Sequence, residues 1–197
     1  MTRANAATCF VCTRAQTPVV PFRYEYPRPM VTVDVALFAP AATAAAGLRV
    51  LLIQRARAPF AGTWALPGGF LDMDEELADA ARRELREETS IKVARLMPLG
   101  TYGKVGRDPR GRTISVVYLA AGDADRLRPR AGDDAGEVAW HPVAALPRLA
   151  FDHRQIVRDG VERLREAARR PTALVRALFG TRPGPAAGRL VRALRHE

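Results

Sequence analysis

The stretch Gly68 to Ile91, GGFLDMDEELADAARRELREETSI, constrains the fold more than any other part of the sequence. From Glu76 to about Glu88 it has a helical pattern, in which Leu77, Ala81 and Leu85 recur at i, i+4 and i+8. These positions share one face of a helix, so that face must pack against a core. A glycine pair stands before the helix, where side chains would hinder a close approach of the backbone. The stretch therefore predicts a loop and a helix packed on a larger structure.

Eight acidic residues lie in this stretch, although the whole chain has a formal net charge of +10. Glu84 and Glu88 are four residues apart and Glu87 flanks both, so the three carboxylates share one edge of the helix. One interpretation is a solvated surface neutralised by neighbouring arginines, but of these three glutamates only Glu87 has an arginine, Arg83, at i, i+4. The other is a divalent cation, because Mg²⁺ takes oxygen ligands and keeps waters and substrate phosphates. A carbonyl of the Gly68–Gly69 loop would add a further oxygen.

The rest of the chain alternates between strand-like and helical segments without regular βαβ repetition, which favours an α/β fold with a mixed sheet. Composition and apolar pattern predict strands at 31–39, 48–56, 93–102, 112–121 and 138–140, with a short extended segment at WALPGG. A second helix is predicted at 153–170, with Ile156, Val157, Val161 and Leu164 on its apolar side. Two short amphipathic pieces follow it, separated by a Pro/Gly break.

The acidic stretch resembles the signature of the Nudix hydrolases. It has Gly69, five residues, Glu75, seven residues, and then Arg83-Glu84-Leu85-x-Glu87-Glu88-x-Ser90-Ile91. Only Ser90 departs from the signature, which has a glycine there that ends the helix in the left-handed conformation. The resemblance implies a Nudix-type α/β/α sandwich with a mixed β-sheet. We expect an N-terminal arm at 1–28, a Nudix hydrolase domain at 29–148, and a C-terminal helix and basic tail at 149–197.

The resemblance also implies a metal site and a reaction. Mg²⁺ or Mn²⁺ would be bound by Glu84, Glu87 and Glu88 with the carbonyl of Gly68. Arg83, counted with the catalytic residues, would orient this site through ion pairs with Glu75 and Glu87 and would not itself react. The implied reaction is metal-dependent hydrolysis of the pyrophosphate bond in a nucleoside diphosphate linked to another moiety.

Hydrolysis of an anionic pyrophosphate needs a general base within reach of the attacking water. Glu84 is one candidate. Glu137 is the other, because it stands in the segment GDDAGE and adjoins the predicted strand at 138–140, which would hold it rigidly. Asp133 and Asp134 in the same segment are interpreted as loop-capping residues.

The segments 101–120 and 132–153 resemble the ADP-ribose pyrophosphatase branch of the family. They resemble equally the sensor domain of Nudix-related transcriptional regulators of NAD metabolism. The substrate would then be ADP-ribose or a similar nucleotide sugar, giving AMP and a sugar phosphate. Arg107 and Arg110 are candidates for binding phosphates, and Phe70 and Tyr102 for stacking on a base; the alternative for each is solubility of a hairpin or filling of the core.

Two other functions stay open. A ligand-sensing regulator of this kind carries a winged helix after its Nudix domain, and only 27 residues follow Arg170. Sanitation of oxidised nucleoside triphosphates, or action on the 5′ end of RNA, would draw on the eleven arginines from Arg154 onward. GC-rich composition explains these arginines equally well, because 29 of the 31 basic residues are arginine. A nucleic-acid partner is therefore not favoured.

Neither a run of 18 apolar residues nor the apolar stretch of a secretory signal occurs in the sequence, so we expect a cytoplasmic protein without a membrane span. Cys9 and Cys12 form a single C-x-x-C pair. Structural zinc needs four ligands, which two subunits of a homodimer would have to share. Reduced thiols in the N-terminal arm are the simpler interpretation, and a homodimer stays possible.

Overall fold

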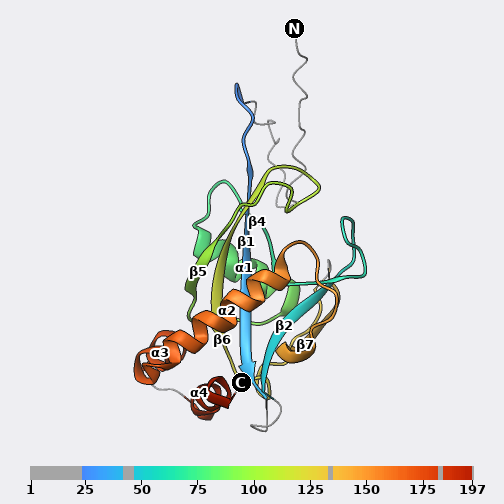
Figure 1. Ribbon diagram of the computed structural model, residues 1–197. Coiled ribbons are helices and arrows are strands. Elements are labelled where there is room, and N and C mark those ends of the chain that lie inside the picture. Colours follow the sequence, from blue (N-terminus) through green and yellow to red (C-terminus); the bar gives the residue numbers. More distant parts are fainter. Residues whose placement is uncertain (1–23, 42–46, 133–134, 182–183, 197) are drawn as a thin grey trace.

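The computed structural model describes residues 24–41, 47–132, 135–181 and 184–196 of the chain (Figure 1). Its strands form one sheet in the order β3-β2-β1-β6-β5, with β4 also paired to β1 and β7 to β2. Strands β1 and β6 run parallel and the other pairs are antiparallel, so the predicted mixed sheet is confirmed. The strands are β1 (Met30–Pro40), β2 (Leu48–Arg55), β3 (Trp64–Ala65), β4 (Gly68–Phe70), β5 (Met97–Tyr102), β6 (Thr113–Ala121) and β7 (Ala135–Pro142).

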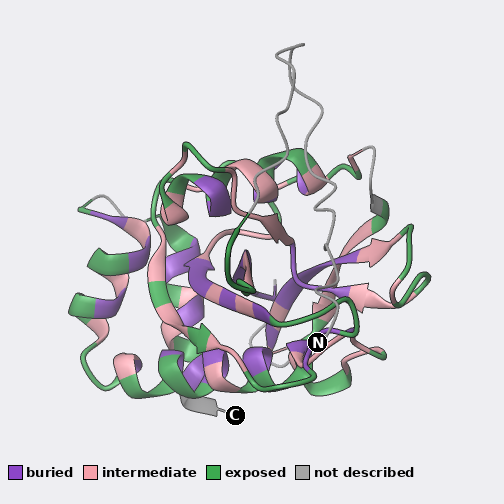
Figure 2. Ribbon diagram, turned by 90° about the horizontal axis from the view of Figure 1, so that it is seen from above, coloured by how far each residue is buried: buried purple, intermediate pink, exposed green. Residues whose placement is uncertain are grey.

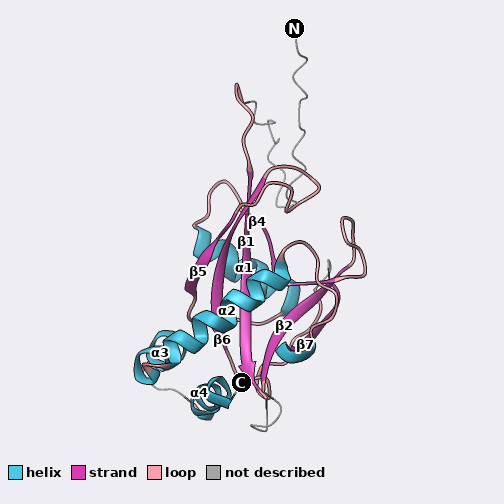
Figure 3. Ribbon diagram, in the orientation of Figure 1, coloured by secondary structure: helices cyan, strands magenta, loops and turns pink. Residues whose placement is uncertain are grey.

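Helices cover both faces of this sheet, which gives the expected α/β/α sandwich (Figure 3). Side chains alternate along a strand, so odd-numbered Val33, Val35 and Leu37 pack on the α1 side while Ala36 and Phe38 pack on the α2 side. Buried positions gather on the strands and on the inward sides of the helices (Figure 2). The helices are α1 (Leu77–Thr89), the short 3₁₀ helix η2 (Val143–Ala145), α2 (His153–Ala168), α3 (Pro171–Phe179) and α4 (Pro185–His196).

Helix α1 has the apolar face that its spacing predicts. Ala81 and Leu85 are fully buried in the core on that side of the sheet, and Leu77 packs against them. The helix ends at Ser90, whose φ of 60° and ψ of 9° are left-handed, and the Ser90 N–H donates to the carbonyl of Arg86 at 2.8 Å. The conformation expected of a glycine at this position is therefore adopted by a serine.

The chain before β7 closes over the end of α1. The N–H of Arg130 donates to the carbonyl of Thr89 at 2.9 Å, and that of Gly132 donates to the carbonyl of Glu88 at 3.1 Å. These bonds satisfy carbonyls that a helix end leaves without intrahelical partners. A segment more than 40 residues from the helix thus fixes the turn that carries Glu88.

The C-terminal region is not a loose tail. Leu174 and Leu178 of α3 and Leu190 and Leu194 of α4 are buried in the same core cluster as Ile156 of α2. The two amphipathic pieces after α2 are thus confirmed as helices, and together with α2 they cover one face of the sheet (Figure 1).

Two expectations lie outside the described residues: the thiols of Cys9 and Cys12, and the loop-capping role of Asp133 and Asp134. The strand predicted at 138–140 begins earlier than expected, at Ala135, and so includes Glu137. Among the helices that the structure describes, none is long and apolar enough to cross a membrane.

Candidate active site

Strand β4 lies against α1 and brings the glycine pair to the glutamates of the helix. The N–H of Gly68 donates to Oε2 of Glu88 at 2.9 Å. A Cβ atom at Gly69 would lie 2.4 Å from Oε1 of Glu84, far inside contact distance, so only glycine leaves that carboxylate in place. The two segments of the sequence motif therefore meet in space, and the glycines allow the approach.

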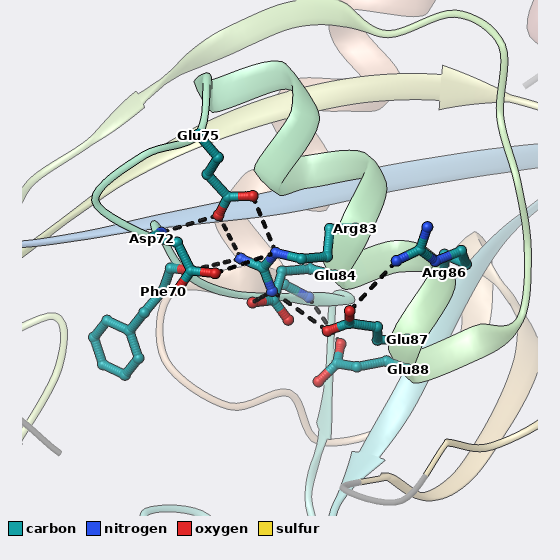
Figure 4. A network of polar contacts seen from close by, with 9 residues as sticks. Phe70, Asp72, Glu75, Arg83, Glu84, Arg86, Glu87 and Glu88 are labelled. Atoms are coloured by element: carbon teal, nitrogen blue, oxygen red, sulfur yellow. Dashed lines mark hydrogen bonds and ion pairs between the residues drawn. The ribbon is translucent and has the colours of Figure 1, made fainter. Parts of the chain in front are cut away.

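Arg83 is the centre of the polar network shown in Figure 4. Its Nη2 and Nε donate to the two oxygens of Glu75 at 2.5 and 3.0 Å, and its Nη1 donates to Glu84 at 2.7 Å and to Glu87 at 3.4 Å. Nη2 also reaches the carbonyl of Phe70 at 3.1 Å. The ion pairs expected with Glu75 and Glu87 are both present. Arg83 thereby ties the loop before α1 to the helix edge.

The two inner carboxylates are held at unusual pKa values. Burial raises the pKa of Glu84 above its ordinary value, against the opposing effect of Arg83. Burial raises the pKa of Glu88 to about 8, and repulsion from Glu84 and Asp34 adds to the rise although the Gly68 N–H lowers it. Shifts of this kind concentrate at functional sites.

A divalent cation fits this arrangement with fewer protein ligands than expected. Within the described part of the chain, no three His, Cys, Asp or Glu side chains are grouped closely enough to hold a metal ion. Glu87 is exposed, and its carboxylate pairs with Arg83 and Arg86 instead of joining Glu84 and Glu88. Mg²⁺ often binds through one or two carboxylates and completes its shell with water and phosphates, so Glu84 and Glu88 suffice for a fit.

Arg107 and Tyr102 form hydrogen bonds with acidic side chains within the fold. The Arg107 side chain is only 4% exposed, and its Nε and Nη2 donate to Asp152 at 2.9 and 2.6 Å. The Tyr102 hydroxyl donates to Asp159 on α2 at 2.8 Å, and its ring packs with the core on the α2 side. Burial first, and the hydrogen bond to Asp159 next, raise the pKa of Tyr102 above its ordinary value. The structure thus gives Arg107 and Tyr102 partners within the fold, and the phosphate contact expected of Arg107 and the base stacking expected of Tyr102 stay predictions.

Arg110 and Phe70 do come together beside the carboxylates. The Arg110 guanidinium lies 5.0 Å from the centre of the Phe70 ring, a cation–π distance. Its Nη2 donates to Asp108 at 2.7 Å, and the Asp108 side chain is only 1% exposed. The Phe70 ring itself points away from the Arg83 network (Figure 4). Two of the four predicted substrate-binding residues, Arg110 and Phe70, thus lie together at one edge of the site.

Three residues beside the site were missed from the sequence. Arg55 ends β2, Phe60 lies in the following loop, and Phe151 stands just before α2. The guanidinium carbons of Arg55 and Arg110 lie 5.1 and 5.6 Å from the centre of the Phe151 ring. The Phe60 ring contacts the Phe151 ring edge to face, with their centres 5.0 Å apart. The only sequence signal was weak, namely aromatic residues in loops, where binding residues are frequent.

A buried polar group behind β4 was also missed. Nδ1 of His153 accepts the Leu66 N–H at 2.9 Å, and Nε2 lies 3.7 Å from Asp34, which also accepts a hydrogen bond from Ser115. Burial lowers the pKa of His153, which suits the acceptor at Nδ1. A Cβ at Gly68 would lie 2.6 Å from Asp34. The sequence signal for this buried group was Asp34, an aspartate inside the apolar segment VTVDVALFA.

Glu137 lies within β7, where it pairs with Gln54 of β2, and not in a preceding loop. Its neighbour Val138 and the next alternate residue, Trp140, pack with the core on the α1 side. Because strand side chains alternate, Glu137 points to the other face of the sheet. This position favours Glu84 over Glu137 as the base.

Comparison with known proteins finds relatives of this chain. Residues 28–160 match the NUDIX domain. An ADP-ribose pyrophosphatase of Methanocaldococcus jannaschii is 44% identical over 113 residues, which cover 56% of this chain and 64% of that protein. The ADPR responsive transcriptional repressor NtrR of Acinetobacter baylyi is 35% identical over 162 residues, covering 79% of this chain and 63% of that protein. The chain thus spans less than two thirds of the length of either relative.

Solved structures of similar fold bind related nucleotides. The NUDIX domain of Shewanella oneidensis NrtR, complexed with ADP ribose, has a TM-score of 0.64 and 36% identity, covering 71% of this chain and 90% of that one. A bifunctional NMN adenylyltransferase/ADP ribose pyrophosphatase of Francisella tularensis, complexed with AMP and a Mn ion, has a TM-score of 0.62 and 33% identity. The match covers 71% of this chain and 43% of the Francisella tularensis chain.

Proposed function

The chain belongs to the Nudix family, and on that premise we propose that it hydrolyses the pyrophosphate bond of a nucleoside diphosphate linked to another group. ADP-ribose is the favoured substrate, with AMP and ribose 5-phosphate as products. The observation that carries the proposal is the pair of carboxylates, Glu84 and Glu88, held against the Gly68–Gly69 turn. The 44% identity to an ADP-ribose pyrophosphatase supports the choice of substrate.

Glu84 and Glu88 are the proposed ligands of Mg²⁺ or Mn²⁺, with Glu87 and the Gly68 carbonyl as further candidates. The bound cation would neutralise the pyrophosphate and favour ionisation of the attacking water. Glu84 is the proposed general base, and its raised pKa brings it nearer to the range in which a carboxylate accepts a proton effectively. Arg83 holds Glu84 in position, while Arg110 and Phe70 bind the substrate at the edge of the site.

A substrate panel tests the proposal. The purified protein, with Mg²⁺ and separately with Mn²⁺, is incubated with ADP-ribose, other dinucleotides, nucleotide sugars and an oxidised nucleoside triphosphate. The expected result is the highest kcat/KM for ADP-ribose. A preference for the oxidised triphosphate would replace this substrate assignment with nucleotide sanitation.

The choice of base needs a separate comparison. Glu84→Gln is expected to lower kcat by two orders of magnitude or more, because it removes both a ligand charge and the base. Glu137→Gln keeps the same strand pairing and is expected to lower kcat less than threefold. A larger loss in Glu137→Gln than in Glu84→Gln would reverse the assignment.

A ligand-sensing regulator is the second candidate function, since the relatedness to the repressor NtrR extends over 79% of the chain. Sequence-dependent retardation of DNA at physiological salt, released by ADP-ribose, would support it. The enzyme is favoured because the glutamates of the motif are all present.

The organisation of the chain is also part of this proposal. We propose that residues 29–148 together with α2 form the catalytic unit, supported by α3 and α4. A homodimer and a cytoplasmic location complete the proposal. Light scattering of the purified protein tests the homodimer, and cell fractionation tests the location.

A further inference from the structure

The segment Leu66–Gly68 joins β3 to β4, and its two N–H groups are accepted by side chains of helices on opposite faces of the sheet (Figure 3). The Leu66 N–H donates to Nδ1 of His153 on α2 at 2.9 Å. The Gly68 N–H donates to Oε2 of Glu88 on α1 at 2.9 Å. Pro67, which lies between them, has no N–H, and its carbonyl accepts an N–H of β1 at 2.8 Å. Both helices and the central strand therefore fix the same three residues.

This segment has little freedom to absorb a displacement. The ring of Pro67 fixes its own φ and restricts the conformation of Leu66 before it. A Cβ atom at Gly68 would overlap the carbonyl oxygen of Val33, so the backbone of Gly68 is already in close contact with β1. A shift of the Leu66 N–H would therefore move Gly68, and with it the hydrogen-bond donor of the Glu88 carboxylate.

His153 is itself held in one protonation state. The residue is 3% exposed, and burial lowers its pKa below the ordinary value, so the ring is neutral at neutral pH. Because Nδ1 accepts the Leu66 N–H, the proton of the neutral ring is on Nε2, which lies 3.7 Å from Asp34. Asp34 is buried and accepts a hydrogen bond from the Ser115 hydroxyl. The contacts from Ser115 through Asp34 to His153 thus present an acceptor to Leu66.

Attachment of α2 to the sheet does not explain these buried polar groups. Four side chains of α2 already pack in the apolar core, and each is at most 5% exposed: Ile156, Val157, Val161 and Leu164. Buried polar groups need hydrogen-bond partners, which an apolar residue at position 153 would not. Buried polar networks rigidify their surroundings and specify one geometry. The geometry specified here is that of the segment that contacts Glu88.

We propose that His153 is a positioning residue for the metal site. It acts through Leu66 and Gly68 on the orientation of the Glu88 carboxylate and is not itself a ligand of the cation. Asp34 holds the His153 ring in the tautomer that accepts at Nδ1. The inference rests on the proposed function for the metal that Glu88 binds, and on the hydrogen bonds of the segment for the positioning.

Three substitutions at position 153 separate the acceptor from the bulk of the ring. His153→Asn places a carbonyl oxygen near the position of Nδ1 and so keeps an acceptor for the Leu66 N–H. His153→Gln places its polar group near the position of Nε2, where it reaches Asp34 but not Leu66. His153→Leu removes both interactions and keeps an apolar side chain. All three variants lose the ring, so recovery in His153→Asn alone is the result that positioning requires.

Hydrogen exchange of backbone amides in the metal-free full chain gives a readout that does not depend on turnover. In His153→Leu and His153→Gln, we expect the Leu66 and Gly68 amides to exchange about tenfold faster than in wild type, relative to amides of β1 that report global stability. In His153→Asn, both amides should stay within about threefold of wild type. ¹⁵N NMR of the wild-type His153 ring should show Nε2 protonated and Nδ1 unprotonated.

Binding of Mn²⁺ without substrate, measured by calorimetry on the full chain, gives a second readout. We expect His153→Leu and His153→Gln to weaken Mn²⁺ binding by about tenfold, the usual effect of losing a group that orients a metal ligand, and His153→Asn to stay within about threefold of wild type. With ADP-ribose at saturating Mn²⁺, kcat should fall in the first two variants while KM changes little.

The control is Leu164→Ala, which opens a cavity in the core about three turns further along α2. It should lower the melting temperature at least as much as His153→Leu does. Mn²⁺ binding and kcat should stay unchanged in this variant, because Leu164 has no part in the contacts that lead to Glu88. If His153→Leu does not fold, the comparison of His153→Asn with His153→Gln decides.

Four results would overturn the inference: no Mn²⁺ binding by the wild type, wild-type Mn²⁺ affinity in His153→Gln, equal losses in His153→Asn and His153→Gln, or faster exchange of Leu66 with unchanged Gly68. These outcomes are separate from the proposed function. If ADP-ribose is not hydrolysed but His153→Gln loses the Mn²⁺ affinity that His153→Asn keeps, the substrate assignment fails and the positioning role stands. If ADP-ribose is hydrolysed and both variants bind Mn²⁺ as the wild type does, the positioning role fails alone.

Discussion

The raised pKa of Glu88 should make the metal-free protein less stable as pH rises. One substitution at this position should remove that pH dependence. Burial raises the pKa of the native carboxyl to about 8 from an ordinary value of 4.5, so the unfolded chain loses its proton first as pH rises. Stability is therefore complete below pH 4.5 and falls as pH rises toward 8. At ~1.4 kcal/mol per pKa unit, the loss reaches about 3 kcal/mol at pH 7.

Glu88→Gln keeps an oxygen that accepts the Gly68 N–H but cannot ionise. We expect this variant to match the wild type near pH 4.5 and to be about 3 kcal/mol more stable at pH 7 in the absence of metal. Glu76→Gln is the control, because Glu76 is an exposed glutamate at the start of the same helix. Its stability should follow the wild type at every pH.

Urea denaturation in EDTA between pH 4.5 and 8 measures these free energies of unfolding. Added Mg²⁺ should stabilise the wild type increasingly as pH rises, since a metal ligand must be deprotonated, and should stabilise Glu88→Gln much less. A stability difference between Glu88→Gln and wild type that does not change with pH would refute the reasoning. So would a variant that is less stable than wild type at pH 8.

Three further substitutions test particular positions. Ser90→Gly should raise the free energy of unfolding by about 1 kcal/mol, because the left-handed conformation at the end of α1 suits glycine, and urea titration beside Ser90→Ala measures it. Gly69→Ala should displace the flexible Glu84 carboxylate, so calorimetry should find weakened Mn²⁺ binding while the melting temperature changes little. An unfolded Gly69→Ala protein would contradict this. Leu190→Ala should cost about 2–5 kcal/mol in urea titration, because Leu190 is fully buried; a cost below 1 kcal/mol would mean that α4 is not part of the core.

Local pattern was enough to predict the elements and the helix edge of the site. The spacing of Leu77, Ala81 and Leu85 determines which side of α1 is buried, and that in turn determines the edge on which Glu84 and Glu88 lie. The left-handed end at Ser90 was expected from the resemblance to the family signature, which has a glycine there. These features depend on contacts within a few turns of one chain segment, which periodicity records.

Contacts between distant segments could not be predicted from local pattern. Arg107 is of a residue type that often binds phosphate, but in the fold it forms an ion pair with Asp152, which is 45 residues away. The Tyr102 hydroxyl likewise donates a hydrogen bond to Asp159 on α2. No local pattern records such pairs, and for the same reason the meeting of Arg55 and Arg110 on Phe151 could not be predicted.

The match to the NUDIX domain ends at residue 160, inside α2, but the hydrophobic core continues through Leu164 to Leu194. The region that matches the NUDIX domain is therefore smaller than the part of this chain that shares one hydrophobic core. A relative that shares only residues 28–160 must shield the corresponding face of its sheet with another segment or with a second chain. In this chain α3 and the end of α2 cover that face beyond the matched region, with α4, so its burial depends on residues that the NUDIX match does not include.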